Sequence, residues 1–275
     1  MEYKQFEKFL FVKKGLQAIT VRGYVVMIRK VLRELGTLKP TIAEMDDYVY
    51  DLYRSEYSYS HKINTVLGIE QWMDFIGTPT RFGRQKKPKL LLKTPLSEAE
   101  ITKMIFSCHN AREVAIITTL AYSGIRNKEL CNLKVKDIDF GSNTLRITQG
   151  KGLKDRIVYV SGHCIKSLLS YLEKYPRGDD DFLFTTVAPN GKKKYLGAAL
   201  RKLVKKVAKR AGFTKRVWPH LLRHSLATNM LNRGANLLTV KQQLGHVFIE
   251  STMIYIHSSE YGAKNEYEQF VPSYV

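Results

Sequence analysis

The chain has 275 residues, of which 44% are hydrophobic and 25% charged, a balance typical of a folded protein with buried cores and not of a disordered or fibrous chain. Lysine and arginine number 45 against 25 acidic residues, so the formal net charge is +20. This excess favours a polyanionic partner, with nucleic acid as the first candidate, although ribosome-associated and membrane-surface proteins share such a charge.

The cysteines give no sign of a disulfide framework or a zinc site. Cys108, Cys131 and Cys164 are odd in number and lack metal-ligand spacing. The N-terminal residues include acids and lysines, and no run approaches the roughly 18 apolar residues of a membrane span. We therefore expect a cytoplasmic protein with neither a signal peptide nor a transmembrane helix.

The first 77 residues are predicted to form a helical unit. Apolar residues from Val21 to Leu35 recur at helical spacing, and Gly36 is a plausible end for that helix. Trp72 and Met73 are expected in the core. Helical periodicity marks residues 2–13, 17–35, 41–56 and 60–77.

Residues 78–95 are predicted to form a basic linker. Between Thr78 and Thr94 the chain has six basic residues, two prolines and no acid, which disfavours a helix. Such a linker can follow a phosphate backbone, and a solvated tether is equally compatible with this composition. The candidate DNA contacts in this segment are Arg81, Arg84, Lys86, Lys87 and Lys89.

Residues 96–275 are predicted to form a second unit, with Ser97 as the cap of its first helix and further helices through Leu120 and over 127–133. Two strands, 144–148 and 156–160, are expected to flank a glycine-rich turn, with a third strand at 182–184. Helices broken at glycines follow from residue 194. The predicted class is therefore mainly α with a small antiparallel β-sheet (α+β).

A second basic run extends from Gly191 to Arg216, with eleven lysines and arginines and no acid. Apolar residues at helical spacing interrupt it, so one face is expected to pack while the other faces phosphates. Lys205 and Lys206 are the candidate DNA contacts on that face.

Two polar positions in the first half of this unit are candidates for phosphate chemistry. Arg126 follows a helix end near a glycine, where its guanidinium can fork onto a phosphate, and Glu129 lies one turn further on. Lys151 lies between two glycines of the predicted hairpin turn, with Lys154 as a competing candidate. Each residue taken alone is more often an ordinary surface residue.

Further candidates follow in the second half. His220 and Arg223 are three residues apart on a helix opened by proline, so both lie near its N-terminus and can form an anion site. His246 follows a Leu-Gly helix end, and Tyr255 comes shortly afterwards. A tyrosine is usually a packing residue, but a deprotonated phenol can be a nucleophile.

Taken in order, these residues resemble the motifs of the tyrosine site-specific recombinases, in particular their Xer-like and phage-integrase-like members. The resemblance covers nearly the whole chain, since the helical N-terminal segment 1–77 resembles the family's SAM-like core-binding domain and residues 96–275 its catalytic domain with a C-terminal tail. The strings that carry it are YSGIRNKEL, GKGLKDR, PHLLRHSLAT and LGHVFIESTMIYIH.

The resemblance implies that a single phosphate is held by several of these side chains. Arg126 and Arg223 would grip the non-bridging oxygens, a task that a metal ion performs in many other phosphoryl transfers. His246 would donate a hydrogen bond to the phosphate, and Glu129 would hold Arg126. No cofactor and no metal ion would be required.

The resemblance also implies the covalent chemistry. Tyr255 would attack the phosphorus with His220 assisting its deprotonation, and Lys151 would protonate the 5′-hydroxyl leaving group. The product would be a 3′-phosphotyrosyl intermediate, which a 5′-hydroxyl of the partner strand resolves.

The implied function is site-specific recombination of double-stranded DNA at a core site, with Xer-type dimer resolution preferred over integration or excision of a mobile element. Two further functions stay open, a type IB topoisomerase-like nicking–closing enzyme and a non-catalytic DNA-binding protein. A tetramer on DNA is expected, with a C-terminal tail that packs in cis or in trans through Tyr267, Phe270 and Val271.

Overall fold

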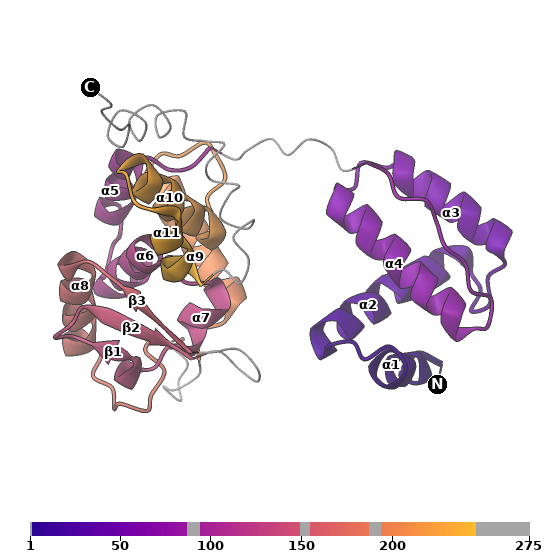
Figure 1. Cartoon of the computed structure of the whole chain (residues 1–275), viewed down its shortest axis with the longest axis horizontal. Coiled ribbons are helices and arrows are strands. Elements are labelled where there is room, and N and C mark those ends of the chain that lie inside the picture. Colours follow the sequence, from indigo (N-terminus) through magenta and orange to yellow (C-terminus); the bar gives the residue numbers. More distant parts are fainter. Residues whose placement is uncertain (1, 87–93, 149–154, 187–193, 246–275) are drawn as a thin grey trace, which may run out of the picture. The chain divides into compact units, whose positions relative to one another are not determined.

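The computed structural model describes residues 2–86, 94–148, 155–186 and 194–245 and divides the chain into two compact units, Met1–Leu91 and Leu92–Val275. Each unit has its own hydrophobic core. In the described residues the fold is mainly helical with one small antiparallel sheet, which confirms the predicted class (Figure 1). No helix of this described part is both long and apolar enough to cross a membrane.

The first unit is built around its last helix, α4, which packs against the other three. Trp72 and Met73 of α4 are fully buried, as predicted. Gly36 ends α2 with φ 71°, and the Thr41 side chain caps α3 by accepting a hydrogen bond from the Glu44 backbone N–H. All four predicted helices are confirmed: α1 (Glu2–Val12), α2 (Ala18–Leu35), α3 (Ile42–Arg54) and α4 (Tyr59–Phe75).

Residues 78–86, at the start of the predicted linker, lie against this unit. Phe82 packs on its core, and the Phe82 backbone N–H donates to the buried Glu70 carboxylate at 2.9 Å. The Tyr53 hydroxyl donates to the carbonyl oxygen of Gly83 at 2.7 Å. The first unit therefore extends past α4 through side-chain and backbone contacts that helical periodicity does not encode.

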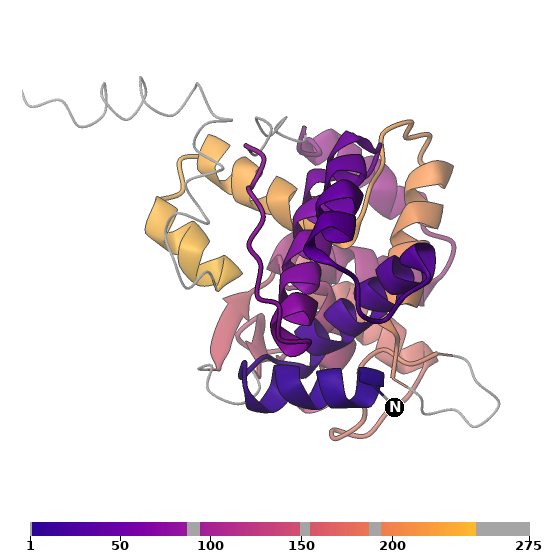
Figure 2. The same cartoon turned by 90° about the vertical axis from the view of Figure 1, so that its right-hand side faces the viewer.

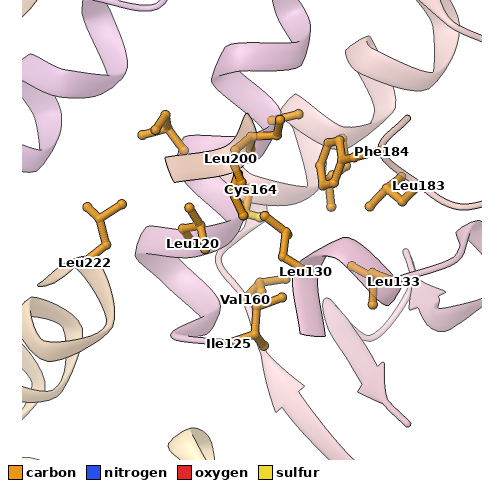
Figure 3. Packing of buried hydrophobic residues seen from close by; sticks show 14 of the residues in the cluster. Leu120, Ile125, Leu130, Leu133, Val160, Cys164, Leu183, Phe184, Leu200 and Leu222 are labelled. Carbon is orange, nitrogen blue, oxygen red and sulfur yellow. The ribbon is translucent and has the colours of Figure 1, made fainter. Parts of the chain in front are cut away.

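The second unit is built around α6, which packs against α5, α8, α9, α10 and β3. Figure 3 shows buried apolar side chains of this core close together, among them Leu120 of α6 and Leu200 of α9. One helix, α8, was not predicted from the sequence; Ser161 caps its start. The helices are α5 (Glu98–Phe106), α6 (Ala111–Ser123), α7 (Asn127–Asn132), α8 (Gly162–Lys174), α9 (Gly197–Arg210), α10 (Pro219–Asn232) and α11 (Leu237–Leu244).

The sheet has the order β1-β2-β3 and is antiparallel throughout, with β1 (Ile138–Asp139), β2 (Thr144–Ile147) and β3 (Arg156–Tyr159). In the β2–β3 register Leu145 faces Val158, and both are fully buried. The predicted hairpin is therefore confirmed, and its buried pair fixes which face meets the core.

The predicted third strand at 182–184 is wrong. Phe182 forms a single bridge with Lys134, and the Leu183 backbone N–H donates to the carbonyl oxygen of Leu133. Leu183 and Phe184 are buried in the core, which accounts for their apolar side chains. The residues that pair with this segment belong to the short connection after α7, and the pairing does not extend into a continuous ladder. The third strand is instead the short β1.

Two neighbouring helices bring the end of the described chain next to the end of α6 and the hairpin. α10 and α11 lie side by side in both views (Figures 1 and 2). α11 also packs against β3, since the Gln243 side-chain amide donates to the carbonyl oxygens of Ser123 and Tyr159 at 3.1 and 2.8 Å. The C-terminus of α11 is thereby fixed next to the end of α6 and the hairpin.

Candidate active site

Arg126 is positioned by a tight turn between two helices. Gly124 ends α6 with φ 63°, and a Cβ atom there would lie 2.8 Å from the Leu244 side chain and 2.9 Å from that of Leu226. Only glycine fits both the left-handed conformation and this close approach. After the buried Ile125, Arg126 takes the N-cap position of α7.

Arg126 is held on two sides. Its Nη1 donates to Glu129 Oε1 at 2.7 Å, and its backbone N–H donates to Glu129 Oε2, also at 2.7 Å. Its Nη2 donates to the carbonyl oxygen of Gly245 at 3.1 Å. The side chain remains 37% exposed, so part of the guanidinium faces outward from the protein.

Arg223 reaches the same place from α10. Pro219 occupies the first turn of that helix, and Arg223 follows one turn later, only 4% exposed. Its Nη1 donates to the carbonyl oxygen of Gly124 at 2.6 Å, and its Nη2 donates to that of Leu244 at 2.7 Å. The two arginines thus donate to consecutive carbonyl oxygens, at Leu244 and Gly245, from elements far apart in the sequence.

His220 completes the described part of this cluster. It lies on the first turn of α10, where one part of its side chain is open to solvent and the rest is covered by the protein. Partial burial and the positive charges of Arg223 and Arg126 lower its pKa from the usual 6.5, against an opposing effect of Glu129. The imidazole is therefore neutral at pH 7 and has a nitrogen lone pair that can accept a proton.

Glu129 has a second arginine partner that was not predicted from the sequence. Arg156 Nη1 and Nη2 donate to Glu129 Oε1 and Oε2 at 3.0 and 2.8 Å, a bidentate ion pair in which the side chains are 11% and 12% exposed. Burial raises the pKa of Glu129, but the hydrogen bonds from Arg156 and Arg126 outweigh it and lower the pKa to about 2. The carboxylate is therefore ionised at neutral pH.

The signal for Arg156 was present in the sequence but ambiguous. It stands at the start of a predicted strand in the string GKGLKDR, among several other basic residues. Nothing in the local pattern separates a buried, paired arginine from an exposed one. We call the described side chains Arg126, Glu129, Arg156, His220 and Arg223 the arginine cluster.

The remaining predicted catalytic residues, Lys151, His246 and Tyr255, lie outside the described residues, as do Lys154 and the tail residues Tyr267, Phe270 and Val271. Gly245, the last described residue, directly precedes His246 in the sequence.

The predicted DNA contacts fall into three groups. Arg81 donates to the Asp74 carboxylate at 2.8 and 3.1 Å, and Arg84 pairs with the buried Glu70 at 2.7 Å, so both hold residues 78–86 against α4. Lys205 and Lys206 are exposed on α9, and Lys86 is also exposed. Lys87 and Lys89 lie outside the described residues.

Comparison with known proteins relates the whole chain to DNA recombinases. The model of the Phage integrase family matches residues 94–261. Tyrosine recombinase XerA of Pyrococcus horikoshii is 32% identical over 247 residues, which cover 88% of this chain and 84% of the relative. Tyrosine recombinase XerD of Listeria monocytogenes is 28% identical over 294 residues, with 98% of each chain covered.

Solved structures show the same likeness. The crystal structure of XerA recombinase has a TM-score of 0.59 at 28% identity and matches over 99% of each chain. The XerH site-specific recombinase bound to its difH substrate has a TM-score of 0.70 at 21% identity, over 98% of this chain and 85% of that one, a likeness of fold.

Proposed function

This chain belongs to the phage integrase family of tyrosine recombinases, enzymes that cleave and rejoin DNA, and on that premise we propose that it recombines a defined core site through a 3′-phosphotyrosyl intermediate on Tyr255. The observation that carries the proposal is the meeting of Arg126, His220 and Arg223 around the end of α11. If each of these three residues were an ordinary surface or packing residue, nothing would require them to lie together.

The arginine cluster supports a role in charge stabilisation. In the transition state of phosphoryl transfer, negative charge is spread over the equatorial oxygens of the transferred group, which include the non-bridging oxygens. Arg126 and Arg223 are permanently cationic and are held in place by backbone carbonyl oxygens before any substrate arrives. In the proposed reaction they bind these oxygens, and His246 donates a further hydrogen bond.

In the proposed reaction His220 and Lys151 carry out the two proton transfers. The neutral imidazole of His220 accepts the phenolic proton of Tyr255 as its oxygen bonds to phosphorus, and the P–O5′ bond breaks. Lys151 donates a proton to the departing 5′ oxygen. A 5′-hydroxyl of the partner strand then attacks the phosphotyrosine, which restores the phenol and forms a new phosphodiester without an external energy source.

The division of the chain into two units favours binding to one defined DNA site over action on any duplex. We propose that the four-helix part of the first unit, residues 1–77, is the core-binding domain and that the exposed lysines Lys205 and Lys206 contact phosphates of the same duplex. The assembly is proposed to be a cytoplasmic tetramer on DNA, with the C-terminal tail contacting a neighbouring subunit.

The proposed biological role is Xer-type resolution of chromosome or plasmid dimers, because relatives named XerA and XerD match over most of their length. Integration or excision of a mobile element is the second candidate, since a transposon integrase shares the fold with a TM-score of 0.71. An attachment-site repeat in the DNA that flanks the gene would favour the second role.

The proposed chemistry is tested with a nicked suicide substrate. Binding sites are first selected from a randomised duplex library, and the selected site is synthesised with a nick beside the cleaved bond. The wild-type protein is expected to form a covalent adduct that survives a denaturing gel, whereas Tyr255→Phe binds the DNA equally well and forms none. Good binding by the wild type without any adduct would contradict the proposal.

A nicking–closing enzyme gives a different result. It relaxes supercoiled plasmids that lack the selected site, whereas the proposed recombinase acts only on plasmids that contain it. This comparison also separates recombination from DNA binding without catalysis, because a purely binding protein changes neither plasmid.

A further inference from the structure

Arg156 occupies the junction of the three chain segments that form the arginine cluster. It is the first residue of β3, opposite Ile147 in the register of the hairpin. Its guanidinium binds both carboxylate oxygens of Glu129 in the α7 segment, and its side chain lies against Gly245 at the end of α11.

The contact with Gly245 is close. A Cβ atom at position 245 would lie 2.4 Å from Arg156 Nε and 2.5 Å from its Cδ, far inside normal van der Waals contact. The carbonyl oxygen of the same Gly245 accepts the hydrogen bond from Arg126 Nη2. Arg156 therefore packs on the peptide that also orients Arg126.

Arg156 differs from Arg126 in how much of its guanidinium is available. Both of its terminal nitrogens are bound to Glu129, its Nε is buried without a hydrogen-bond partner in the described structure, and its side chain is 11% exposed. Arg126 has 37% of its side chain exposed. A phosphate can approach Arg126, and the terminal nitrogens of the buried Arg223 donate to neutral carbonyl oxygens, whereas Arg156 would first have to give up its ion pair with a carboxylate.

We infer that Arg156 is a positioning residue, which fixes Arg126 through the shared carboxylate of Glu129 and through Gly245 and does not itself bind the phosphate. This inference rests on the proposed function, because it concerns the rate of DNA cleavage by the same site. A guanidinium suits the task because it holds both carboxylate oxygens in one plane, which a lysine ammonium cannot do.

The decisive experiment is a double-mutant cycle on single-turnover cleavage of the nicked site at saturating DNA. R156Q is expected to slow adduct formation by about 10- to 100-fold, the typical effect of a small misplacement of a catalytic group. R126Q is expected to slow it by about 100- to 1000-fold. If Arg156 acts through Arg126, the double variant matches R126Q within about threefold.

R156K and R146Q serve as comparison variants. R156K keeps the charge but not the paired geometry and is expected to fall between the wild type and R156Q. R146Q removes an arginine from the neighbouring strand β2 whose side chain is 68% exposed and pairs with Asp155 at 3.5 Å, and it is expected to cleave like the wild type. Thermal unfolding of each variant identifies any that fail to fold, and R156K then takes the place of R156Q in the cycle.

Three rate measurements would overturn the inference: wild-type cleavage by R156Q, full activity of R156K beside a slow R156Q, or multiplication of the two single effects in the double variant. A loss of DNA affinity by R156Q equal to its loss of rate would instead make it a phosphate ligand and also contradict the inference. These results differ from failure of the proposed function, in which the wild type itself forms no adduct.

Discussion

Glu129 provides the negative charge that pairs with both Arg126 and Arg156 in the arginine cluster. Replacing it by glutamine leaves the buried Arg156 and the partly exposed Arg126 without their anionic partner, which we expect to destabilise the fold by about 3 kcal/mol, the lower end of the range for a broken buried ion pair. Adduct formation by E129Q is expected to fall as well. Denaturant unfolding and the nicked-site assay measure the two effects, and wild-type values in both would contradict this role.

The stability contribution of Glu129 has a defined pH dependence. Its folded pKa of about 2 lies below the ordinary 4.5, so the unfolded chain takes up the proton first as the solution is acidified. The contribution is fully present above pH 4.5 and is lost as the pH falls from there toward 2. Unfolding free energies of the wild type and E129Q are therefore expected to converge over this range.

His220 is expected to set the acidic limb of the cleavage rate. Since its pKa lies below 6.5 in the folded protein, the imidazole remains a base at pH 7 and becomes protonated only in more acidic solution. The rate of adduct formation should stay level down to pH 6.5 and fall below it. H220Q should be slow and lack this limb, and an acidic limb that begins above pH 7 in the wild type would contradict the assignment.

At the level of elements, the end of α11 requires glycine for two separate reasons. Gly245 has φ 66°, and its missing Cβ makes room for Arg156. Gly234 offers a matched control, because it has φ 82° but no atom within 4 Å of the place of a Cβ. Left-handed backbone alone costs about 1 to 2 kcal/mol with alanine.

We therefore expect G234A to lose about that much stability and keep cleavage, while G245A loses more stability and most of its cleavage activity. Thermal unfolding and adduct formation check both variants. Equal behaviour of the two would mean that contact between Gly245 and Arg156 has no role in the site.

Some of the helices and strands could be predicted from the sequence, and others could not. Periodicity and caps predicted the first four helices and the hairpin, because those signals are local. The apolar residues 182–184 resemble a strand in sequence. Leu183 and Phe184 are apolar because this segment packs in the core, and its backbone forms only an isolated bridge at Phe182. The pairing of Arg156 with Glu129 depends on the placement of β3 against α7, which no local pattern encodes.

At the level of the whole molecule, the net charge of +20 predicts strongly salt-dependent DNA binding. A protein that contacts about six to ten phosphates loses roughly 10³- to 10⁵-fold in affinity between 50 and 200 mM salt. Replacing Lys205 and Lys206 by glutamine is expected to reduce the slope of log K against log salt by about one for each contact removed. An unchanged slope would place these lysines away from the duplex.

Not every basic residue of the chain is available to a polyanion. Arg84 is paired with the buried Glu70, and Arg81 shares the Asp74 carboxylate with Lys14, so part of this positive charge is already balanced within the first unit. Composition alone counted them as free cations. Their ion pairs explain why a basic segment does not translate directly into phosphate contacts.

The carbonyl oxygens of Leu244 and Gly245 have a consequence for selectivity. Because Arg126 and Arg223 donate to them, a small anion from solution has to compete with ready-made internal acceptors to occupy the cluster. DNA can displace these internal acceptors because it makes many simultaneous contacts elsewhere on the protein, whereas an isolated ion makes no additional contacts. Inorganic phosphate and sulfate should consequently be poor inhibitors of strand cleavage, even at concentrations that far exceed that of the DNA.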